Sequence, residues 1–460
     1  MLDDILVEAR KLCEPDEEER KRVAKVAQEI LQKASEVIAK RKIEGKAVIG
    51  GSYAKDTWLK GDCDIDLFLK FPTKIGQEEF KRLSMDMAEE TLAGYPTLVR
   101  YSEHPYLEGF VNGIRVNVVP CFDVEPRRWI SAADRSPYHT EYVKEHLKEE
   151  LKADVRLLKK FLKVRNIYGA EVKTKGFSGY VCEVLILKYQ SFINTLTAFS
   201  NFERGSIISL GEVPADVRLR FQNPIIILDP VDPERNLGAA VSEESLATLI
   251  LSARSFLKKP RVEYFKIPDV NQETSHILKK ILDNLILLKF KHKPRSPDII
   301  WGQLHKTSEA IRKQLEIRGF EILKVSEASS EKDESAILLL TESTTLPNYV
   351  LKVGPEVYRK EDTARFIEKN LNRSTATWFT EDGRIVSLQE RVQRDIVDVL
   401  SSILKNPKEL GVSEGLREAL KTSTTILTGK EALDAVENIS WLRKEVHKFV
   451  STDQLVFNSA

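Results

Sequence analysis

The chain has 460 residues but few cysteines, no long apolar run and almost no net charge. Its four cysteines are far apart and form no CxxC pair, so we expect reduced thiols and no zinc site. No stretch of about 18 apolar residues occurs, which argues against a membrane span. The first residues, Met1 to Asp4, are acidic and lack an apolar core, so export is not expected. These absences favour a cytoplasmic protein.

The formal net charge of the chain is only +1. A basic excess is typical of proteins that bind nucleic acid, so this total gives such a function little support. An acidic metal site on one face and a basic groove on another would nevertheless sum to near zero. The net charge therefore does not exclude a nucleic-acid partner.

A chain of this length is too long for one ordinary core, and two to four domains are expected. Residues 17–43 carry apolar side chains at the three-to-four spacing of an amphipathic helix. Asn112-Gly113 predicts a hairpin turn, and Pro120 predicts the end of the strand that follows it. The other predicted elements of this part are strands at 47–49, 65–71, 97–102, 107–111 and 114–119 and a helix at 77–93. This mixture predicts an α/β or α+β module.

The rest of the chain is predominantly helical at first and mixed later. Helical patterns run from about 141 to 204 and from about 242 to 257, with a short buried strand at 225–228. Farther on, two helices and two strands predict a compact αββα unit, at 301–318, 335–341, 347–352 and 360–370. The best linker candidates are Lys291–Pro297 and Ser326–Glu334.

Two carboxylates at the start of the second predicted strand are the first sign of chemistry. Side chains alternate along a strand, so Asp64 and Asp66 share one face while Ile65 and Leu67 point to the core. Two carboxylates this close repel each other, and the arrangement is costly without a cation. Mg²⁺ prefers oxygen ligands and commonly takes one or two carboxylates together with substrate phosphates. We therefore expect a magnesium site here.

A glycine loop precedes this acidic strand. Gly50 and Gly51 allow the backbone to approach a phosphate closely, and consecutive N–H groups can form an anion-binding nest. Ser52 adds a hydroxyl donor and Lys55 adds a positive charge beside the same loop. A phosphate loop followed by a carboxylate pair predicts metal-assisted nucleotidyl transfer.

The order and spacing of these motifs is similar to a known family. Gly51-Ser52, eleven residues and then Asp64-Ile65-Asp66-Leu67 match the polymerase-beta-like signature of GS followed by D-h-[DE]-h. Further motifs follow in the family's order: 118–121 (VVPC), 134–139 (DRSPYH), 156–159 (RLLK), 167–171 (IYGAE), 176–180 (GFSGY) and 229–236 (DPVDPERN). The chain resembles the archaeal-type (class I) CCA-adding tRNA nucleotidyltransferases, densely to about residue 245 and sparsely after about 370.

This resemblance implies a multidomain α+β fold. A polymerase-beta-like nucleotidyltransferase head would span 1–143, and a helical neck at 144–262 would complete the nucleotide pocket. An RNA-binding C-terminal part at 263–460 would comprise an α/β body and a helical tail. The implied activity is template-independent addition of CCA to the tRNA 3′ end from CTP and ATP, with two Mg²⁺ ions and release of pyrophosphate. The resemblance leaves a homodimer open.

The resemblance also implies which side chains hold the nucleotide. The residues that would contact its triphosphate and ribose are Ser52, Lys55, His139, Lys159 and Tyr168. Arg235 would help to read the base. The family often has arginine where this chain has Lys55, which keeps the charge but loses bidentate binding.

One position departs from the family's pattern. The family has a third carboxylate in the segment where this chain has Asn117, so the catalytic and metal-binding set here is Asp64, Asp66 and Asn117. Alternation along strand 114–119 puts Arg115, Asn117 and Val119 on one face. An amide oxygen can bind a metal, but it carries no charge and cannot accept the proton of the attacking hydroxyl. A natural variant with weak activity, a binding-only relative and a deliberate Asp→Asn change all agree with this sequence.

Two other functions are compatible with the same motifs. One is another polymerase-beta-like enzyme, such as a poly(A) polymerase or an oligoadenylate synthetase, which incorporation of C before A would exclude. The other is a protein that binds the tRNA 3′ end without catalysis, which tight tRNA binding without turnover would favour.

Overall fold

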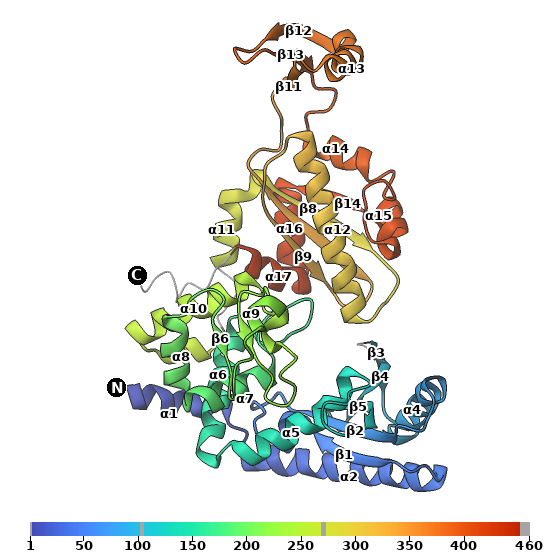
Figure 1. Cartoon of the computed structure of the whole chain (residues 1–460), viewed down its shortest axis with the longest axis vertical. Coiled ribbons are helices and arrows are strands. Elements are labelled where there is room, and N and C mark those ends of the chain that lie inside the picture. The colour runs from blue at the N-terminus through green and yellow to red at the C-terminus, as the bar shows by residue number, and fades with distance from the viewer. Residues whose placement is uncertain (1, 102–104, 268–272, 451–460) are drawn as a thin grey trace. The chain divides into compact units, whose positions relative to one another are not determined.

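The computed structural model describes residues 2–101, 105–267 and 273–450, and the chain divides into two compact units, Met1–Asp269 and Val270–Ser451 (Figure 1). Neither predicted linker marks this division. Lys291–Pro297 connects strand β8 (Leu285–Lys291) to helix α12 (Pro297–Arg318), and Ser326–Glu334 spans the hairpin between β9 (Ile322–Ser329) and β10 (Glu334–Thr341). Both segments lie inside the second unit, so the linker prediction is wrong.

The first unit contains a five-stranded sheet with the strand order β1-β2-β5-β4-β3. Its strands are β1 (Lys46–Gly50), β2 (Asp64–Pro72), β3 (Thr97–Tyr101), β4 (Pro105–Val111) and β5 (Ile114–Asp123). All neighbouring strands are antiparallel except β2 and β5, which are parallel. The predicted hairpin turn between β4 and β5 is confirmed, because Asn112 and Gly113 have φ angles of 50° and 78°, as a type I′ turn requires.

Two helices cover one face of this sheet. Helices α2 (Glu17–Arg41) and α4 (Gln77–Thr91) pack side by side there (Figure 1). Val26 and Ile30 of α2 share one buried core with Ile65 and Leu67 of β2. Asp64 and Asp66 alternate with these core residues and therefore face the other side of the sheet. Helix α3 (Gly51–Ala54) contacts β2 and also contacts α5 (Arg135–His146).

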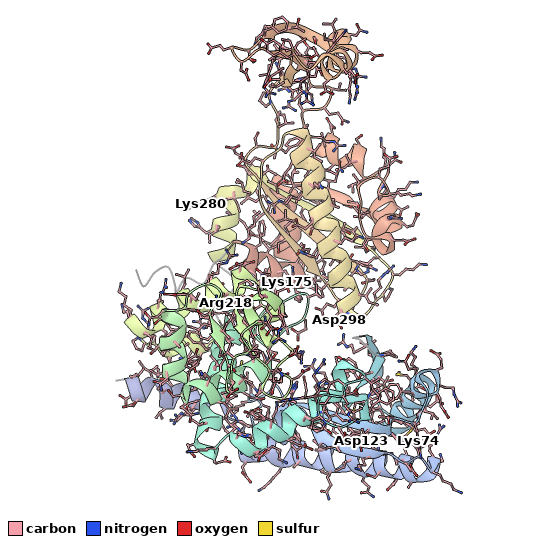
Figure 2. All side chains as sticks on the ribbon, in the orientation of Figure 1. Lys74, Asp123, Lys175, Arg218, Lys280 and Asp298 are labelled. Carbon is pink, nitrogen blue, oxygen red and sulfur yellow. The ribbon has the colours of Figure 1, made fainter. Side chains whose placement is uncertain are left out.

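Strand β5 does not stop at Pro120, which corrects the prediction. It continues to Asp123, and Pro120 lies opposite Leu69 of β2. The pairing with β4 reaches only Val118, so one side of Pro120 faces no strand and its missing N–H is tolerated. Asp123, labelled in Figure 2, then accepts from Lys70 Nζ at 2.7 Å and Lys46 Nζ at 3.4 Å, which ties β5 to β2 and β1.

The remainder of the first unit is mostly helical, as predicted for about 141–204 and 242–257, and it also contains a helix at Leu2–Cys13 that was not predicted. Its helices are α1 (Leu2–Cys13), α6 (Glu149–Val164), α7 (Gly179–Tyr189), α8 (Phe192–Ser200), α9 (Val217–Arg220) and α10 (Glu243–Lys258), with short parallel strands β6 (Ile207–Ile208) and β7 (Ile226–Ile227). An aromatic cluster around Phe161 joins α6, α8 and α10 to the segment that contains Tyr264 and Phe265.

The second unit is built on a four-stranded sheet in the order β14-β8-β10-β9. Ile286 and Leu288 of β8 join a core with α12, while Leu285 and Leu287 join a second core on the opposite face. A strand buried on both faces explains the continuous apolar run of β8. The other elements are α11 (Glu273–Ile281), α14 (Ile396–Ile403), α15 (Arg417–Ser423), β14 (Thr425–Thr428), α16 (Gly429–Asn438) and α17 (Ser440–Val450).

A separate small sheet corrects the predicted αββα unit. It has the order β11-β13-β12 and contains β11 (Tyr349–Glu356), β12 (Ser374–Phe379) and β13 (Arg384–Glu390), with α13 (Lys360–Asn370) against one face. The two predicted strands, now β10 and β11, therefore belong to different sheets. Each pairs with a strand that the sequence left unassigned, β9 for β10 and β13 for β11. No helix in the described ranges has the length and apolar character needed to cross a bilayer.

Candidate active site

The glycine loop and the acidic strand are in direct contact. Gly51 has a φ angle of 65°, and a Cβ at this position would lie 1.9 Å from Asp66 Oδ2. Its backbone N–H donates to Thr140 Oγ1 of α5 at 3.2 Å. Only glycine can occupy this position without displacing the Asp66 carboxylate. Ser52 follows in α3, and Lys55 ends that helix.

The parallel pairing of β2 with β5 arranges the carboxylates. Asp64 lies opposite Arg115 and Asp66 lies opposite Asn117, so the predicted common face of these residues is confirmed. Arg115 Nε donates to Asp64 Oδ1 at 2.7 Å, and Asn117 Nδ2 donates to Asp66 Oδ1 at 2.9 Å. Arg115 thus supplies a cation beside the carboxylate pair, a role that the sequence analysis did not assign to it.

Both carboxylates are poorly solvated. Burial raises the pKa of Asp64 to about 6, although Arg115 acts in the opposite direction. Burial also raises the pKa of Asp66, against the hydrogen bond from Asn117 and the charge of Lys55. Desolvated carboxylates gain from a bound cation, because it favours their charged form.

The donor groups present fit a hard divalent cation. Asp64 and Asp66 supply carboxylate oxygens, and Asn117 Oδ1 is a buried acceptor without a hydrogen-bond partner among the described residues. Mg²⁺ accepts such all-oxygen sets. Across the described ranges no three His, Cys, Asp or Glu side chains gather as a metal site, so any such site here depends on the two aspartates and the amide.

Two of the predicted nucleotide-binding residues meet around a buried glutamate, and a third lies near one of them. Lys55 Nζ donates to Glu183 Oε2 at 2.5 Å, and Lys159 Nζ donates to Glu183 Oε1 at 3.0 Å. A Cβ on Gly179, the first residue of α7, would lie 2.9 Å from the Tyr168 hydroxyl and 3.6 Å from Lys159 Nζ. Lys159 and Tyr168 therefore lie together at the start of α7, and Lys159 shares Glu183 with Lys55.

Two more of the predicted residues, His139 and Arg235, meet around Asp229. His139 Nε2 lies 2.8 Å from Asp229 Oδ2, and Arg235 reaches the same oxygen at 3.7 Å. The His139 ring stacks on Tyr180 with centroids 4.0 Å apart, and Lys55 Nζ lies 5.6 Å from the centre of the Tyr180 ring. Burial lowers the pKa of His139 despite the neighbouring Asp229 carboxylate. Tyr180 thus connects the Glu183 and Asp229 clusters.

A strained turn fixes the position of Lys55. The next residue, Asp56, is in the left-handed region with φ of 52°. Its carboxylate accepts from Arg20 of α2 and from Arg156 of α6, each at 2.6 Å. Arg156 also donates to the backbone oxygens of Asp56 and Trp58, at 2.5 and 3.1 Å. Arginines on two helices therefore clamp the turn that connects the glycine loop to β2.

Several site residues were missed by sequence reasoning, although some left a signal. Glu183 is a charged residue in a helix whose neighbours from Val181 to Leu187 are otherwise apolar and buried. A carboxylate in such a helix requires a buried partner. Asp229 stood in a recognised motif without a role. Tyr180 also stood in a recognised motif, and Arg115 was placed on one face with Asn117, but neither received a role. Thr57 carried no local signal, because its partner Glu183 is distant in the sequence.

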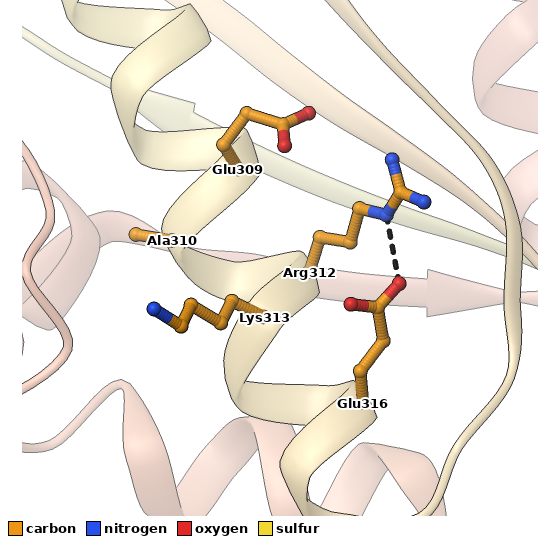
Figure 3. A pocket seen from close by; sticks show the side chains of 5 residues that line it. All are labelled: Glu309, Ala310, Arg312, Lys313 and Glu316. Atoms are coloured by element: carbon orange, nitrogen blue, oxygen red, sulfur yellow. Dashed lines mark hydrogen bonds and ion pairs between the residues drawn. The ribbon is translucent and has the colours of Figure 1, made fainter.

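A hollow elsewhere on the surface contains none of the predicted site residues. It lies along α12 in the second unit and is lined by Glu309, Ala310, Arg312, Lys313 and Glu316 (Figure 3). Arg312 Nε donates to Glu316 Oε1 at 2.8 Å within the helix. Its lining is an ordinary solvated helix face.

The phosphate loop, the paired carboxylates and the lysine cluster define a nucleotidyltransferase. A family model described as "Nucleotidyltransferase domain" matches residues 30–139. "tRNA nucleotidyltransferase, second domain" matches 153–266, and "CCA-adding enzyme, C-terminal domain" matches 283–429.

Relatives in archaea extend these matches over most of the chain. A CCA-adding enzyme of Pyrobaculum aerophilum is 36% identical over 88% of this chain and 94% of its own length. One from Sulfurisphaera tokodaii is 38% identical over 82% and 88%, and one from Methanopyrus kandleri is 34% identical over 99% and 98%. The chain therefore belongs to the family of CCA-adding enzymes. Among solved structures, the Cid1 poly(U) polymerase aligns with a TM-score of 0.47 at 13% identity, over 58% of this chain and 98% of the polymerase chain. The family membership of this chain does not depend on that alignment.

We predict that Gly51→Ala inactivates the site while leaving the fold intact. The added Cβ must displace the Asp66 carboxylate, and a misplacement of about 1 Å costs about 100-fold in rate. Gly61→Ala is the matched control, because Gly61 has a similar φ of 71° but nothing within 4 Å of an added Cβ. Both variants should lose about 1–2 kcal/mol of stability from the left-handed backbone. Nucleotide transfer and thermal unfolding are measured for both, and equal transfer rates would contradict the contact with Asp66.

Proposed function

We propose that this protein adds CCA to the 3′ end of tRNA without a template, using CTP and ATP. The observation that carries the proposal is the contact of Asp66 with the Gly51 loop, which leads directly into Lys55 and its cluster. That arrangement joins a metal-binding carboxylate to a phosphate-binding loop. The family of CCA-adding enzymes supplies the substrate class.

The proposed reaction is an attack by the tRNA 3′-hydroxyl on the α-phosphate of CTP or ATP. A bond forms from this oxygen to phosphorus, the bond to the β-phosphate oxygen breaks, and pyrophosphate leaves. Asp64, Asp66 and the Asn117 amide oxygen would hold Mg²⁺, which when bound stabilises charge developing on the phosphate oxygens. The residues that would hold the triphosphate and ribose are Ser52, Lys55, His139, Lys159 and Tyr168.

Base selection without a template must come from protein groups. Arg235 is suited to this role, because its side chain is 43% exposed while one end is tethered near Asp229. A guanidinium can donate several hydrogen bonds in a fixed geometry. We propose that it reads the base of CTP or ATP.

We further propose that the chain works as a head (1–143), a neck (144–262) and an RNA-binding part (263–460). The glycine loop and carboxylates lie in the head, and Lys159, Tyr168, Glu183 and Arg235 lie in the neck. In the third part, Lys291 and Lys293 are exposed and available to RNA phosphates, whereas Lys289 pairs with Glu334 and Arg295 donates to Gly415 O.

An incorporation assay tests this function. Given tRNA that lacks its 3′ CCA, the protein should add two C residues and then one A, and ATP alone should give no elongation. Asp66→Ala should abolish transfer but keep tRNA affinity, because the RNA contacts lie elsewhere. Continuous incorporation of A would identify a poly(A) polymerase instead. Tight tRNA binding without transfer under any divalent metal would identify a binding protein, the alternative that Asn117 favours.

We predict that Asn117→Asp raises the transfer rate. An aspartate can accept the proton of the attacking hydroxyl and adds a charged metal ligand, and a positioned general base contributes roughly 10²–10⁴-fold. The rate should rise by about 100-fold or more while CTP affinity changes much less, since the gain is in the transition state. Single-turnover rates and nucleotide titrations separate the two effects. A wild-type chain that is already as fast as the variant would show that another group is the base.

We propose that the small sheet of the second unit pairs two copies of the chain. On one of its faces, register places six uncharged side chains of β11, β13 and β12 together, with Glu390 at one end of the same face: Leu351, Val353, Val386, Leu388, Ala376 and Trp378. Leu351, Val353 and Trp378 are 49%, 55% and 43% exposed. Helix α13 covers the opposite face, where Phe366 lies against Gly354. RNA contacts need cations, whereas an apolar face is suited to its own copy.

This pairing predicts a dimer that one substitution dissociates. Val353→Asp places a charge on the apolar face and should give a monomer by light scattering. Lys352→Asp, on the other face of the same strand, should remain a dimer and is the control. A monomeric wild-type protein at micromolar concentration would rule out the interface.

A further inference from the structure

Glu183 is a buried charge to which the reaction as proposed gives no role. It lies on α7 with none of its surface exposed, between Cys182 and Val184, which are equally buried. A carboxylate in apolar surroundings is stable only with cations and donors around it. The identity of those partners therefore indicates what Glu183 is for.

Both oxygens of Glu183 are bonded to groups of the proposed nucleotide site. Oε2 accepts from Lys55 Nζ at 2.5 Å, and Oε1 accepts from Lys159 Nζ at 3.0 Å and from Thr57 Oγ1 at 2.6 Å. Thr57 in turn accepts from Lys159 Nζ through its hydroxyl at 3.0 Å and its backbone oxygen at 3.1 Å. Glu183, Lys159 and Thr57 are thus each hydrogen-bonded to the other two, and the Glu183 carboxylate fixes the positions of both ammonium groups.

The charges of this network do not cancel. Two ammonium groups share one carboxylate, which leaves one positive charge in excess. Burial lowers the pKa of Lys159, with Glu183 opposing this effect. Burial alone would raise the pKa of Glu183, but Lys159 and Lys55 hold it at about 2. Glu183 is therefore ionised at neutral pH and favours the charged form of Lys159.

We propose that Glu183 is a positioning residue for the triphosphate of the incoming nucleotide, because its two oxygens hold the ammonium groups of Lys55 and Lys159 in place. This inference rests on the proposed function, which gives the two lysines their role. Two further features at the same place favour an anion. The Tyr168 hydroxyl lies beside the start of α7, where backbone N–H groups carry partial positive charge. The Lys55 ammonium also contacts the Tyr180 ring, which connects the network to His139.

The first test is titration calorimetry with CTP, ATP and inorganic tripolyphosphate, each with Mg²⁺ and without RNA. Glu183→Gln should weaken the binding of all three ligands by the same factor, about 10- to 100-fold. This factor corresponds to the loss of one hydrogen bond to a charged group. Arg235→Ala is the control, and it should weaken CTP and ATP but not tripolyphosphate. Wild-type affinity for tripolyphosphate in folded Glu183→Gln would overturn the inference. If the wild-type protein bound none of the three ligands, the proposed function itself would fail.

The pH dependence of CTP binding separates positioning from a purely structural role. The other groups facing Lys159 are Lys55, Thr57, Tyr168 and Cys182, and burial raises the pKa of Tyr168 and Cys182 and keeps both neutral. Without the Glu183 charge, the neutral Thr57 oxygens are the acceptors left to Lys159, and no anion among these groups opposes its deprotonation. The affinity of Glu183→Gln relative to wild type should therefore fall further as pH rises from about 7 to about 9, below the ordinary lysine pKa of about 10.4. A deficit that is constant with pH would overturn the inference.

Glu183→Asp keeps the charge but shortens the side chain. If Glu183→Gln does not fold, this variant tests whether Glu183 positions the two lysines. It should bind tripolyphosphate more weakly than the wild-type protein, because it cannot reach both lysines, and its deficit should be constant with pH. Circular dichroism establishes that each variant is folded before titration. Glu183→Asp with wild-type affinity for tripolyphosphate would overturn the inference.

Discussion

The parallel pairing of β2 with β5, inside a sheet that is otherwise antiparallel, is the constraint on which the site depends. This pairing places Asp66 opposite Asn117, and the buried core residues of β2 determine the register of the two strands. Ile65 and Leu67 are completely buried under α2 and α4, so a slip by one residue would expose them and turn the aspartates inward. The geometry of the acidic centre is therefore maintained by hydrophobic packing on the opposite face of the sheet, and not by attraction among the polar groups themselves.

Charge in this protein is partly balanced within each functional cluster. Asp64 has Arg115, the two lysines share Glu183, and Asp229 has His139 and Arg235. Because several of these charges have a nearby partner of opposite sign, the total of +1 carries no information about phosphate binding. What matters is the local excess: one positive charge at the lysine cluster and one negative charge among Asp64, Asp66 and Arg115. These excesses suit a triphosphate and a divalent cation respectively.

The sequence predicts the parts of the site that lie within about twenty residues of one another. Gly51, Lys55, Asp64 and Asp66 were found because a loop and a strand have fixed local geometry. Glu183 was not, because its partners Lys55 and Lys159 come from segments that only the tertiary fold brings to α7. Pro120 was misjudged for a related reason. Whether a proline ends a strand depends on which neighbouring strand is present, and the extent of β4 pairing is not a local property. The strands β10 and β11 give a second example. They are close enough in the sequence to form one sheet, but each pairs with other strands, so they belong to two different sheets.

Asn117 has a structural consequence apart from its lack of basicity. Its Nδ2 donates to Asp66 Oδ1 at 2.9 Å, so the amide holds the carboxylate in place even without a cation. A carboxylate at 117 would put two negative oxygens at about that distance, and their repulsion would have to be relieved by a metal ion or by a shared proton. The amide therefore favours a site whose geometry exists before metal and nucleotide arrive, whereas a carboxylate favours a site that metal binding completes. The asparagine therefore gives up a proton acceptor but keeps Asp66, a proposed metal ligand, against the Gly51 loop.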